Sequence, residues 1–350
     1  MAIDAALPAL VDFEKLASWM DAQGLPGGAI EDATSIAGGT QNVLVRFSRG
    51  EREFVLRRPP KHLRPKSNDA LGREGRVLAA LAGSAVPHPA FIAGCFDPSL
   101  MGGFVFYLME PVAGFNPMTG LPALHARDAK VRHAMGLEAA AAIGELARLD
   151  HEALGLGSLG RPEGFLERQV PRWLSELESY ARHEGYSGPD IPGLDEVARW
   201  LERNCPTLTR PGIIHGDYHL ANLLFAHDGP RLAAVVDWEM CTIGDPLLDL
   251  GWLIATWPDA DGFALGPMAS VAQLGGWPTP DELAARWAET SGRDVRALDW
   301  FVVLASFKLG IVLEGTYARA CAGKAPKATG DFLHAVTQAL FRRALERVRG

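Results

Sequence analysis

Side chains whose types and spacing suit phosphoryl transfer gather in a short part of the sequence. His215, Asp217 and Asn222 lie in the segment HGDYHLANLLF, and Asp237 follows at the end of the apolar run RLAAVV. In phosphoryl transfer one carboxylate meets the hydroxyl to be phosphorylated, while an amide and a second carboxylate hold Mg²⁺ against the nucleotide phosphates. Carboxylate and amide oxygens are the ligands that such a hard cation prefers. The set predicts a small-molecule kinase that uses a nucleotide of the ATP type.

The local sequence predicts a hairpin that brings these side chains to one place. An apolar segment at 223–225 is followed by the turn-like residues HDGP, and the run from 231 to 236 has the β-branched residues of a short buried strand. Asn222 and Asp237 therefore stand at the outer ends of one hairpin, from which both can reach a single metal ion. Alone, Asp237 would be an ordinary turn or helix-cap residue, so the prediction depends on the joint pattern.

The segment from His215 to Asn222 resembles the catalytic loop of the aminoglycoside phosphotransferase family, within the protein-kinase-like superfamily. The resemblance implies that Asp217 positions the acceptor hydroxyl and accepts its proton, and that Asn222 and Asp237 are the metal ligands. His219 stands where protein kinases carry the lysine of this loop, and we include it among the catalytic residues. His215 is expected to be structural.

The segment after Asp237 extends the resemblance. Trp238 and Glu239 replace the Phe and Gly of the kinase Asp-Phe-Gly element, as in the small-molecule branch. Asp245 and Asp249, in the sequence DPLLD, match the same branch, and we expect both to support the catalytic loop. The alternative for Asp245 is the N-cap of a following helix that has Pro at its first position.

A glycine-rich turn lies upstream, between strands predicted at 33–36 and 43–47. Glycine lets the backbone approach a phosphate and leaves amides free to bind it. The turn therefore predicts a nucleotide-phosphate site at Gly38, Gly39, Thr40 and Asn42. Taken alone, such a turn is more often that of an ordinary hairpin, and its place upstream of the catalytic loop carries the prediction.

The returning strand at 53–57 resembles the Val-Ala-Ile-Lys strand of kinases, whose last residue contacts the nucleotide phosphates. Arg57 stands in place of that Lys and keeps its positive charge on a bulkier, forked group. Glu74, in a helix predicted over 68–81, resembles the Glu that pairs with the strand cation, so an Arg57–Glu74 pair is expected. The alternative is a solvated Glu on the outer face of the helix.

A predicted strand at 104–110 leads into PVAG and resembles the hinge between kinase lobes, where backbone groups near Met109, Glu110 and Val112 meet the adenine. The resemblance implies an α+β, protein-kinase-like fold: a small antiparallel β-sheet lobe with one helix, then a larger, mainly helical lobe. We place the nucleotide-binding lobe at 1–110, and the helical lobe with the catalytic loop and acceptor site at 111–350. Helical spacing predicts helices at 11–23, 128–150, 163–182, 194–204, 246–256, 279–291, 297–322 and 330–348.

Composition limits the alternatives. The chain has 350 residues, 48% of them hydrophobic and 22% charged, which suits a folded chain with a sizeable core. A net charge of −8 argues against a nucleic-acid partner, which needs a basic surface. The 4 cysteines are scattered without a CxxC pair, the start lacks a signal-peptide pattern, and no uninterrupted apolar segment reaches membrane-spanning length. We expect a cytoplasmic protein without a membrane partner; the sequence leaves the oligomeric state open.

The acceptor site is expected in the helical lobe. Arg168 and Arg172 lie in a basic-aromatic cluster, and Lys308 and Arg319 lie on an apolar helix. Both segments resemble a subgroup related to the kinase-like domains fused to acyl-CoA dehydrogenases, and basic side chains suit an anionic acceptor such as a hydroxy acid or a hydroxyacyl-CoA. An aminoglycoside site would need clustered carboxylates, and the C-terminal sequence has no run of them. The alternative is that the basic residues form surface salt bridges.

The predicted function is an ATP- or GTP-dependent, Mg²⁺-dependent phosphotransferase that acts on a hydroxyl of a small molecule. One alternative is an antibiotic kinase of the aminoglycoside 3'-phosphotransferase type. Another is a nucleotide-binding pseudoenzyme, which the replacement of Lys by Arg57 keeps open. A helical interaction protein without catalysis would explain none of the spacings.

Overall fold

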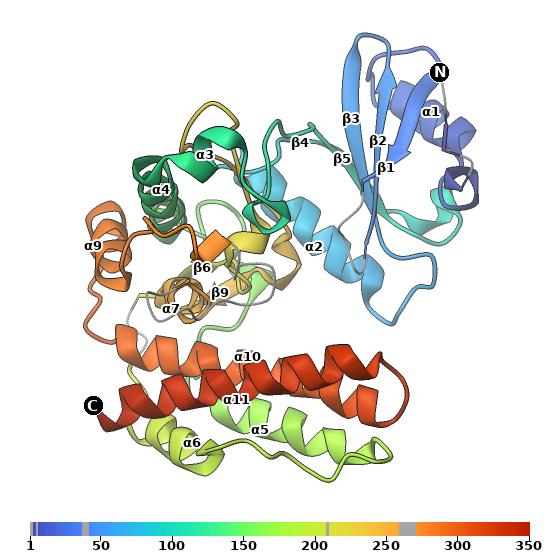
Figure 1. Ribbon diagram of the computed structural model, residues 1–350. Helices are drawn as coiled ribbons and strands as arrows, with labels where there is room; N and C mark the ends of the chain where they lie inside the picture. The colour runs from blue at the N-terminus through green and yellow to red at the C-terminus, as the bar shows by residue number, and fades with distance from the viewer. Residues whose placement is uncertain (1–2, 5, 37–41, 208–209, 259–270) are drawn as a thin grey trace.

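A five-stranded antiparallel sheet forms the N-terminal part of the fold in the computed structural model, which describes the chain except residues 1–2, 5, 37–41, 208–209 and 259–270 (Figure 1). In spatial order β1-β2-β3-β5-β4, the strands are β1 (Ile30–Ser35), β2 (Val43–Arg49), β3 (Arg52–Arg58), β5 (Phe106–Met109) and β4 (Phe91–Cys95). The accompanying helices are α1 (Phe13–Ala22) and α2 (Ser67–Ala80). The sequence pattern predicts all of these except β4, whose residues FIAGC show no regular alternation.

The sheet separates two environments, because alternate residues of a strand point to opposite faces. In β3, Phe54 and Leu56 lie in a buried cluster with Leu16 and Met20 of α1. Arg57 lies on the opposite face and meets α2. The strand is thus held by an apolar face and presents a cation to the part of the molecule that carries the catalytic loop.

Helices make up most of the remaining chain (Figure 1). They are α3 (Ala123–Arg127), α4 (Ala129–Arg148), α5 (Gln169–Ser179), α6 (Leu194–Arg203), α7 (Leu247–Ala255), α9 (Pro280–Ser291), α10 (Leu298–Cys321) and α11 (Lys327–Arg349). α10 runs beside α11, with α5 and α6 against the pair, while α7 packs between α10 and the α4–α9 pair. α5 begins at Gln169, later than predicted, because the preceding residues form turns in which Arg168 binds nearby backbone carbonyls. A small antiparallel sheet followed by helices matches the predicted α+β architecture.

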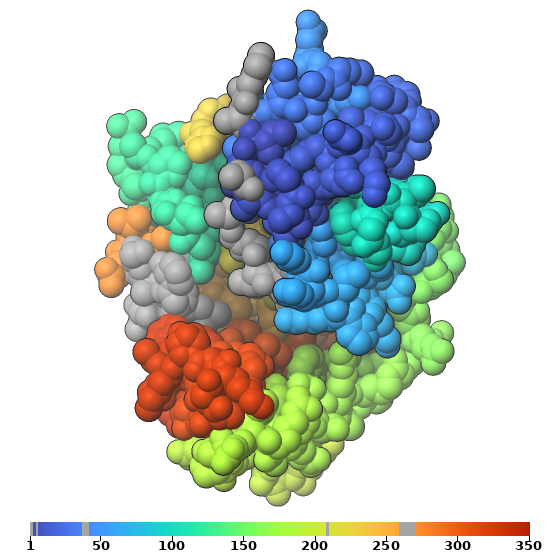
Figure 2. Space-filling model, turned by 90° about the vertical axis from the view of Figure 1, so that its right-hand side faces the viewer, coloured from blue at the N-terminus to red at the C-terminus, as the bar shows by residue number. Residues whose placement is uncertain are grey.

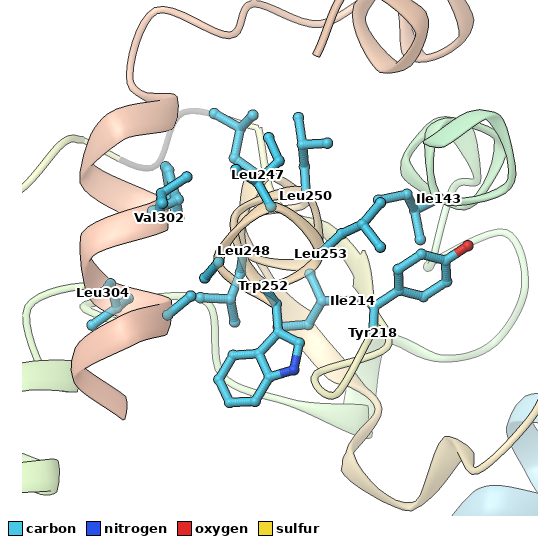
Figure 3. Close-up of a cluster of buried hydrophobic side chains, with 14 of the residues drawn as sticks. Ile143, Ile214, Tyr218, Leu247, Leu248, Leu250, Trp252, Leu253, Val302 and Leu304 are labelled. Atoms are coloured by element: carbon cyan, nitrogen blue, oxygen red, sulfur yellow. The ribbon is translucent and has the colours of Figure 1, made fainter. Parts of the chain in front are cut away.

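Helix α7 lies within the core of the helical part. All of its residues are buried, and a helix that is buried all round is typical of a protein core. Figure 3 shows its Leu and Trp side chains between Ile143 of α4 and Val302 and Leu304 of α10. Asp249 is the acidic exception and is buried with its neighbours. A carboxylate in such a place has to be hydrogen-bonded to be tolerated.

Two short strand pairs carry the predicted active residues. They are β6 (Gly212–Ile214) with β9 (Thr242–Gly244), and β7 (Leu223–Phe225) with β8 (Leu232–Val235). The β7–β8 hairpin is confirmed as predicted, whereas the sequence gives no sign of β9, a strand of 3 residues. Phe115 exchanges two backbone hydrogen bonds of 2.9 Å with Phe225. The chain that leaves the sheet is therefore joined directly to the β7–β8 hairpin.

Helix α10 is long and apolar enough, by length and composition alone, to cross a membrane, with a mean hydropathy of 1.5 in its most apolar stretch. Lys308 interrupts that stretch, so the expectation that no uninterrupted apolar segment reaches that length still holds. In the structure 72% of the stretch is buried, as in the core helix of a folded domain. Its contacts with α7 and α11 account for its apolar character.

Gly251 tests the packing that holds α7 in place. A Cβ atom added there would lie 2.7 Å from the backbone carbon and 2.8 Å from the Cβ of Phe301 in α10. We expect Gly251→Ala to lower the free energy of unfolding, measured in urea, by about 1–3 kcal/mol, because overpacking outweighs the gain in helix propensity. Gly229→Ala is the control, since nothing lies within 4 Å of its added Cβ. Equal losses in the two variants would contradict the close α7–α10 contact.

Candidate active site

The loop between β6 and β7 brings the sequence-predicted residues Asp217, His219 and Asn222 together. Nε2 of His219 lies 3.2 Å from Oδ1 of Asp217. Nδ2 of Asn222 donates to Oδ2 of Asp217 at 3.1 Å and to its backbone carbonyl at 2.9 Å. Nδ1 of His219 accepts the backbone N–H of Ala221 at 3.3 Å, so the hydrogen-bond pattern assigns the ring proton to Nε2. His219 and Asn222 both donate to the Asp217 carboxylate and fix its orientation.

Asp217 is held as a carboxylate. Burial acts to raise its pKa, but the hydrogen bond that His219 donates, followed by electrostatic attraction from His219, His215 and Lys308, lowers the pKa to about 2. The side chain keeps 34% of its surface exposed, so an incoming group can reach it. An ionised and accessible carboxylate can orient a hydroxyl and accept its proton.

A buried carboxylate on α7 fixes the start of the loop. Oδ2 of Asp249 accepts the backbone N–H of His215 at 2.6 Å, and Oδ1 accepts that of Gly216 at 2.9 Å. Burial raises the pKa of Asp249 to about 6, although both N–H groups act to lower it. Gly216 has a φ of +86°, and a Cβ atom there would lie 2.6 Å from the carbonyl oxygen of Met240, so glycine is required at this turn. Asp249 supports the loop as expected, whereas Oδ1 of Asp245 accepts the backbone N–H of Leu247, the first residue of α7, at 3.0 Å instead of bonding to the loop.

His215 joins the loop to the segment that leads into Asp237. Its Nε2 donates to the carbonyl of Val236 at 3.0 Å, and its Nδ1 accepts the backbone N–H of Asp217 at 3.3 Å. Burial lowers the pKa of His215, and the ring packs edge-on against Trp238 at 4.9 Å between centroids. The ring thus fixes the chain just before Asp237, in agreement with the structural role expected for it.

Asn116 is a supporting residue that the sequence does not indicate. Its Nδ2 donates to the carbonyls of Ala221 and Leu223, on both sides of Asn222. Its Oδ1 accepts the backbone N–H of Met118 at 2.8 Å. A single Asn after the hinge carries no pattern of its own, so only the fold reveals that it positions Asn222.

Arg57 meets two carboxylates. Its Nη2 donates to Oδ1 of Asp237 at 2.6 Å, and its Nε lies 3.0 Å from Oε2 of Glu74. The second contact is an ion pair without hydrogen-bond alignment, since neither atom has a hydrogen-bond partner among the described residues. Glu74 is 2% exposed, and burial raises its pKa to about 7 against the attraction of Arg57. The predicted Arg57–Glu74 pair is confirmed, and the alternative of a solvated Glu74 is wrong.

Trp238 and Glu239, which follow Asp237, contact the N-terminal part. The backbone N–H of Trp238 donates to Oε1 of Glu74 at 3.2 Å. Nδ2 of Asn42 donates to Oε2 of Glu239 at 3.4 Å, and burial, followed by the charge of Asp237, raises the pKa of Glu239. A cavity of about 70 Å³ has Asn42, Glu74 and Glu239 among its lining. Glu239 therefore faces the predicted phosphate region, a role that its place two residues after Asp237 could have suggested.

The remaining predicted nucleotide contacts are only partly placed. Met109 ends β5, and the side chain of Glu110 pairs on the surface with Arg52 at 2.8 Å. Val112 is half-buried in the segment that leads to Phe115. Adenine contact at these positions stays a prediction. Three residues of the predicted phosphate turn lie outside the described residues: Gly38, Gly39 and Thr40.

The four basic residues considered for the acceptor divide into two kinds. Arg168 binds backbone carbonyls of its own turn, and Arg319 donates to a neighbouring Thr hydroxyl at 2.7 Å. Arg172 is exposed, with its guanidinium 5.3 Å from the centre of the Trp173 ring, and the buried ammonium of Lys308 lies 5.6 Å from the same centre. Arg172 and Lys308 converge on Trp173, whereas the other two have local partners.

The oxygen donors present fit Mg²⁺. Because Nδ2 of Asn222 is directed at Asp217, its Oδ1 remains for another partner. The carbonyl of Asn222 accepts the backbone N–H of Val236 at 2.9 Å, which brings Asn222 beside Asp237. Kinases hold Mg²⁺ through such a pair together with the nucleotide phosphates.

The small antiparallel sheet is followed by a hinge and a larger helical part, and one hairpin separates Asn222 from Asp237. This is the architecture of a protein-kinase-like phosphotransferase. Residues 32–285 match the model of the phosphotransferase enzyme family. The chain belongs to this family, as the resemblance of its catalytic loop implies.

The relatives among named proteins come from the expected subgroup. Human acyl-CoA dehydrogenase family member 11 is 32% identical over 289 residues, which cover 80% of this chain and 35% of that protein. The chicken protein of the same name is 30% identical over 331 residues, or 92% of this chain and 41% of that protein. The chain thus spans well under half the length of the curated relatives it matches.

Solved structures confirm the fold class. A crystal structure of a Ralstonia eutropha protein, provisionally named an aminoglycoside phosphotransferase, superposes with a TM-score of 0.78 at 28% identity, and covers 97% of this chain and 98% of that one. The predicted α+β, protein-kinase-like fold is therefore correct.

Removing the His219 imidazole tests how Asp217 is kept ionised. In His219→Ala the imidazole no longer opposes the effect of burial, and we expect the pKa of Asp217 to rise from about 2 toward or above its ordinary value of 3.8. A depressed carboxyl pKa stabilises the folded protein above the unfolded value and loses that effect as pH falls through the folded value. Wild-type stability should therefore carry a contribution from Asp217 that fades between pH 4 and 2, and the variant should lack it.

Carboxyl ¹³C NMR titration of the metal-free protein measures this pKa. Exposed His62 provides the control, since His62→Ala should leave the Asp217 titration unchanged. An unaltered Asp217 titration in His219→Ala would show that the imidazole does not set its charge.

Proposed function

We propose that the chain transfers the terminal phosphoryl group of ATP or GTP, with Mg²⁺, to a hydroxyl of a small anionic molecule such as a hydroxy acid or a hydroxyacyl-CoA. The observation that carries the proposal is the accessible Asp217 carboxylate, ionised and oriented by His219 and Asn222. A pseudoenzyme that only binds nucleotide would need no such group.

In the proposed reaction the terminal phosphoryl group passes from the nucleotide to the acceptor hydroxyl. The acceptor oxygen bonds to the terminal phosphorus, the bond from that phosphorus to the bridging oxygen breaks, and the nucleoside diphosphate leaves with the electron pair. Asp217 orients the hydroxyl and takes its proton. With a pKa of about 2, this carboxylate is a weak base, so the proton moves late, after bonding to phosphorus has made the hydroxyl acidic. Orientation is therefore its larger contribution.

Positive charge would be supplied from both sides of the hinge. Mg²⁺, when bound, withdraws charge from the phosphate oxygens, and Oδ1 of Asn222 with the carboxylate of Asp237 would hold it. Arg57 offers a permanently charged, forked group to a phosphate oxygen. Glu74 holds that group in place through its 3.0 Å ion pair.

Two observations favour an anionic acceptor. The relatives at 30% identity or more are named acyl-CoA dehydrogenases, which suggests an acyl-CoA thioester as the molecule that carries the hydroxyl. Figure 2 shows a recess between the blue residues of α2 and the red residues where α10 and α11 meet. Around that meeting point, residues 319–331 carry the basic Arg319, Lys324 and Lys327 against the acidic Asp331.

An antibiotic kinase is the competing function. One solved structure of this fold, aminoglycoside phosphotransferase APH(4)-Ia, holds ADP and hygromycin B. It superposes with a TM-score of 0.57, covering 93% of this chain and 97% of that one, at 16% identity. A similarity at this identity establishes the fold alone, so the acceptor has to be determined by direct assay.

Substitution of the two aspartates separates chemistry from metal binding. We expect Asp217→Asn to keep nucleotide affinity but to lose about two or more orders of magnitude in turnover, because orientation and proton acceptance are removed. Asp237→Ala should instead abolish the Mg²⁺-dependent part of nucleotide binding. Calorimetry with and without a chelator measures binding, and coupled release of the nucleoside diphosphate measures turnover.

Exposed Asp228 supplies the matched control, and Asp228→Asn should change neither quantity. Full turnover in Asp217→Asn would refute its role. Failure of the wild type to bind any purine nucleotide at millimolar concentration would remove both the kinase and the pseudoenzyme.

A panel of acceptors decides the substrate class. We expect diphosphate release with hydroxy acids or hydroxyacyl-CoAs and little with kanamycin, since a basic acceptor site repels a polycation by about 1 kcal/mol per close pair in solvent. Comparing each hydroxylated compound with its deoxy counterpart controls for background hydrolysis. Kanamycin turnover well above that of every anionic acceptor would identify an antibiotic kinase instead.

A further inference from the structure

An ammonium group lies buried against the catalytic loop. Lys308, in the apolar helix α10, is 7% exposed, and its Nζ donates to the backbone carbonyl of Gly216 at 3.1 Å. The same Nζ lies 4.4 Å from the centre of the Trp252 ring and 5.6 Å from that of Trp173. A carbonyl and two aromatic faces thus replace the water that an ammonium with three N–H donors would otherwise bind.

This placement does not favour folding by itself. Burial lowers the pKa of Lys308 to about 8; the carboxylates of Asp217 and Asp249 act to raise it, and the guanidinium of Arg172 lowers it further. A cationic group whose pKa falls on folding carries its charge at a cost in stability. A Met side chain would fill a similar space without that cost, so packing alone does not explain an ammonium here.

The carbonyl held by Lys308 belongs to the peptide group that joins Gly216 to Asp217. The N–H of the same peptide group donates to Nδ1 of His215 at 3.3 Å, so both of its polar atoms are fixed. The preceding peptide group is held by Asp249, which accepts the N–H of Gly216 at 2.9 Å. Rotation of this backbone would swing the Asp217 carboxylate out of its present direction.

We propose that Lys308 is a positioning residue for phosphoryl transfer, which fixes the Gly216–Asp217 peptide group and thereby the direction of the Asp217 carboxylate. The inference rests on the proposed function of Asp217. It gives Lys308 a role in the catalytic loop, in place of the acceptor-binding role that its sequence context suggests.

Two substitutions separate the hydrogen bond from the charge. Lys308→Met keeps the length but removes both, whereas Lys308→Gln keeps an N–H donor for the Gly216 carbonyl. We expect Lys308→Met to lower kcat by about 10- to 100-fold, as small misplacements of reacting groups do. Nucleotide Kd and acceptor KM should stay within about twofold, since uniform binding is not removed. Lys308→Gln should recover several-fold in kcat. Lys130→Met, on an exposed position of α4, should match the wild type.

The pH profile adds a second readout. Wild-type kcat should fall as pH rises through about 8, because the amine then loses the charge that faces Asp217 and Asp249, while Arg172 keeps its own. That fall should be absent from both Lys308 variants.

The stability of the wild type should instead rise as pH increases from about 8 to about 10.5. The unfolded lysine holds its proton to about pH 10.5 and the folded one to about 8, so Lys308→Met should melt above the wild type at pH 7 and lose that advantage above pH 10.

Amide hydrogen exchange tests the proposal without any substrate. The N–H of Asp217 should exchange about 10-fold or more faster in Lys308→Met than in the wild type, because the peptide group opens more often, and Lys308→Gln should restore part of the protection. If the wild type transfers phosphate to no acceptor, the proposed function fails, and the exchange experiment still decides the role of Lys308.

Three results would overturn the proposal. Unchanged exchange at Asp217 in Lys308→Met would remove the positioning role. A raised acceptor KM with unchanged kcat would make Lys308 an acceptor ligand. Loss of folding in both variants would make the ammonium a structural requirement.

Discussion

The buried carboxylate of Asp249 accepts hydrogen bonds from two backbone N–H groups of the catalytic loop, those of His215 and Gly216. The loop between β6 and β7 has little regular structure of its own, so its shape depends on this anchor. Charge-assisted hydrogen bonds to both N–H groups offset the cost of burying the carboxylate. Because α7 is packed on every side, the anchor cannot shift unless the core shifts with it. The core thereby determines where Asp217 stands.

Three side chains then fix the orientation of the Asp217 carboxylate. His219 and Asn222 donate to its carboxylate from within the loop, and Lys308 holds the peptide group before it from α10. The outcome is a carboxylate that is a weak base but a well-directed one. This suits a reaction in which little charge develops on the attacking hydroxyl until late, so that direction matters more than proton affinity.

The sequence could predict what is encoded locally. The spacing from Asp217 to Asn222 and the short hairpin to Asp237 lie within one stretch of chain, and the structure brings them together as expected. The Arg57–Glu74 pair follows from the resemblance to kinases, in which a strand cation pairs with a Glu of the next helix, and the structure contains it. Asn116 and the orientation of Lys308 could not be predicted, since each depends on contacts far along the chain. Lys308 lies in a helix with no polar face, so periodicity gives no hint of the direction in which it points.

One guanidinium, that of Arg57, serves carboxylates from two parts of the molecule, Glu74 on α2 and Asp237 after β8. A metal ion bound at Oδ1 of Asp237 would take the oxygen that Arg57 contacts, and a phosphate that draws Nη2 of Arg57 away would leave that oxygen free. The free energies of these two events are consequently coupled, and the coupling is reciprocal by thermodynamic necessity. Metal and nucleotide should each raise the affinity of the protein for the other, even before they touch. Cooperativity between the two proposed ligands would then follow from the sharing of a single side chain.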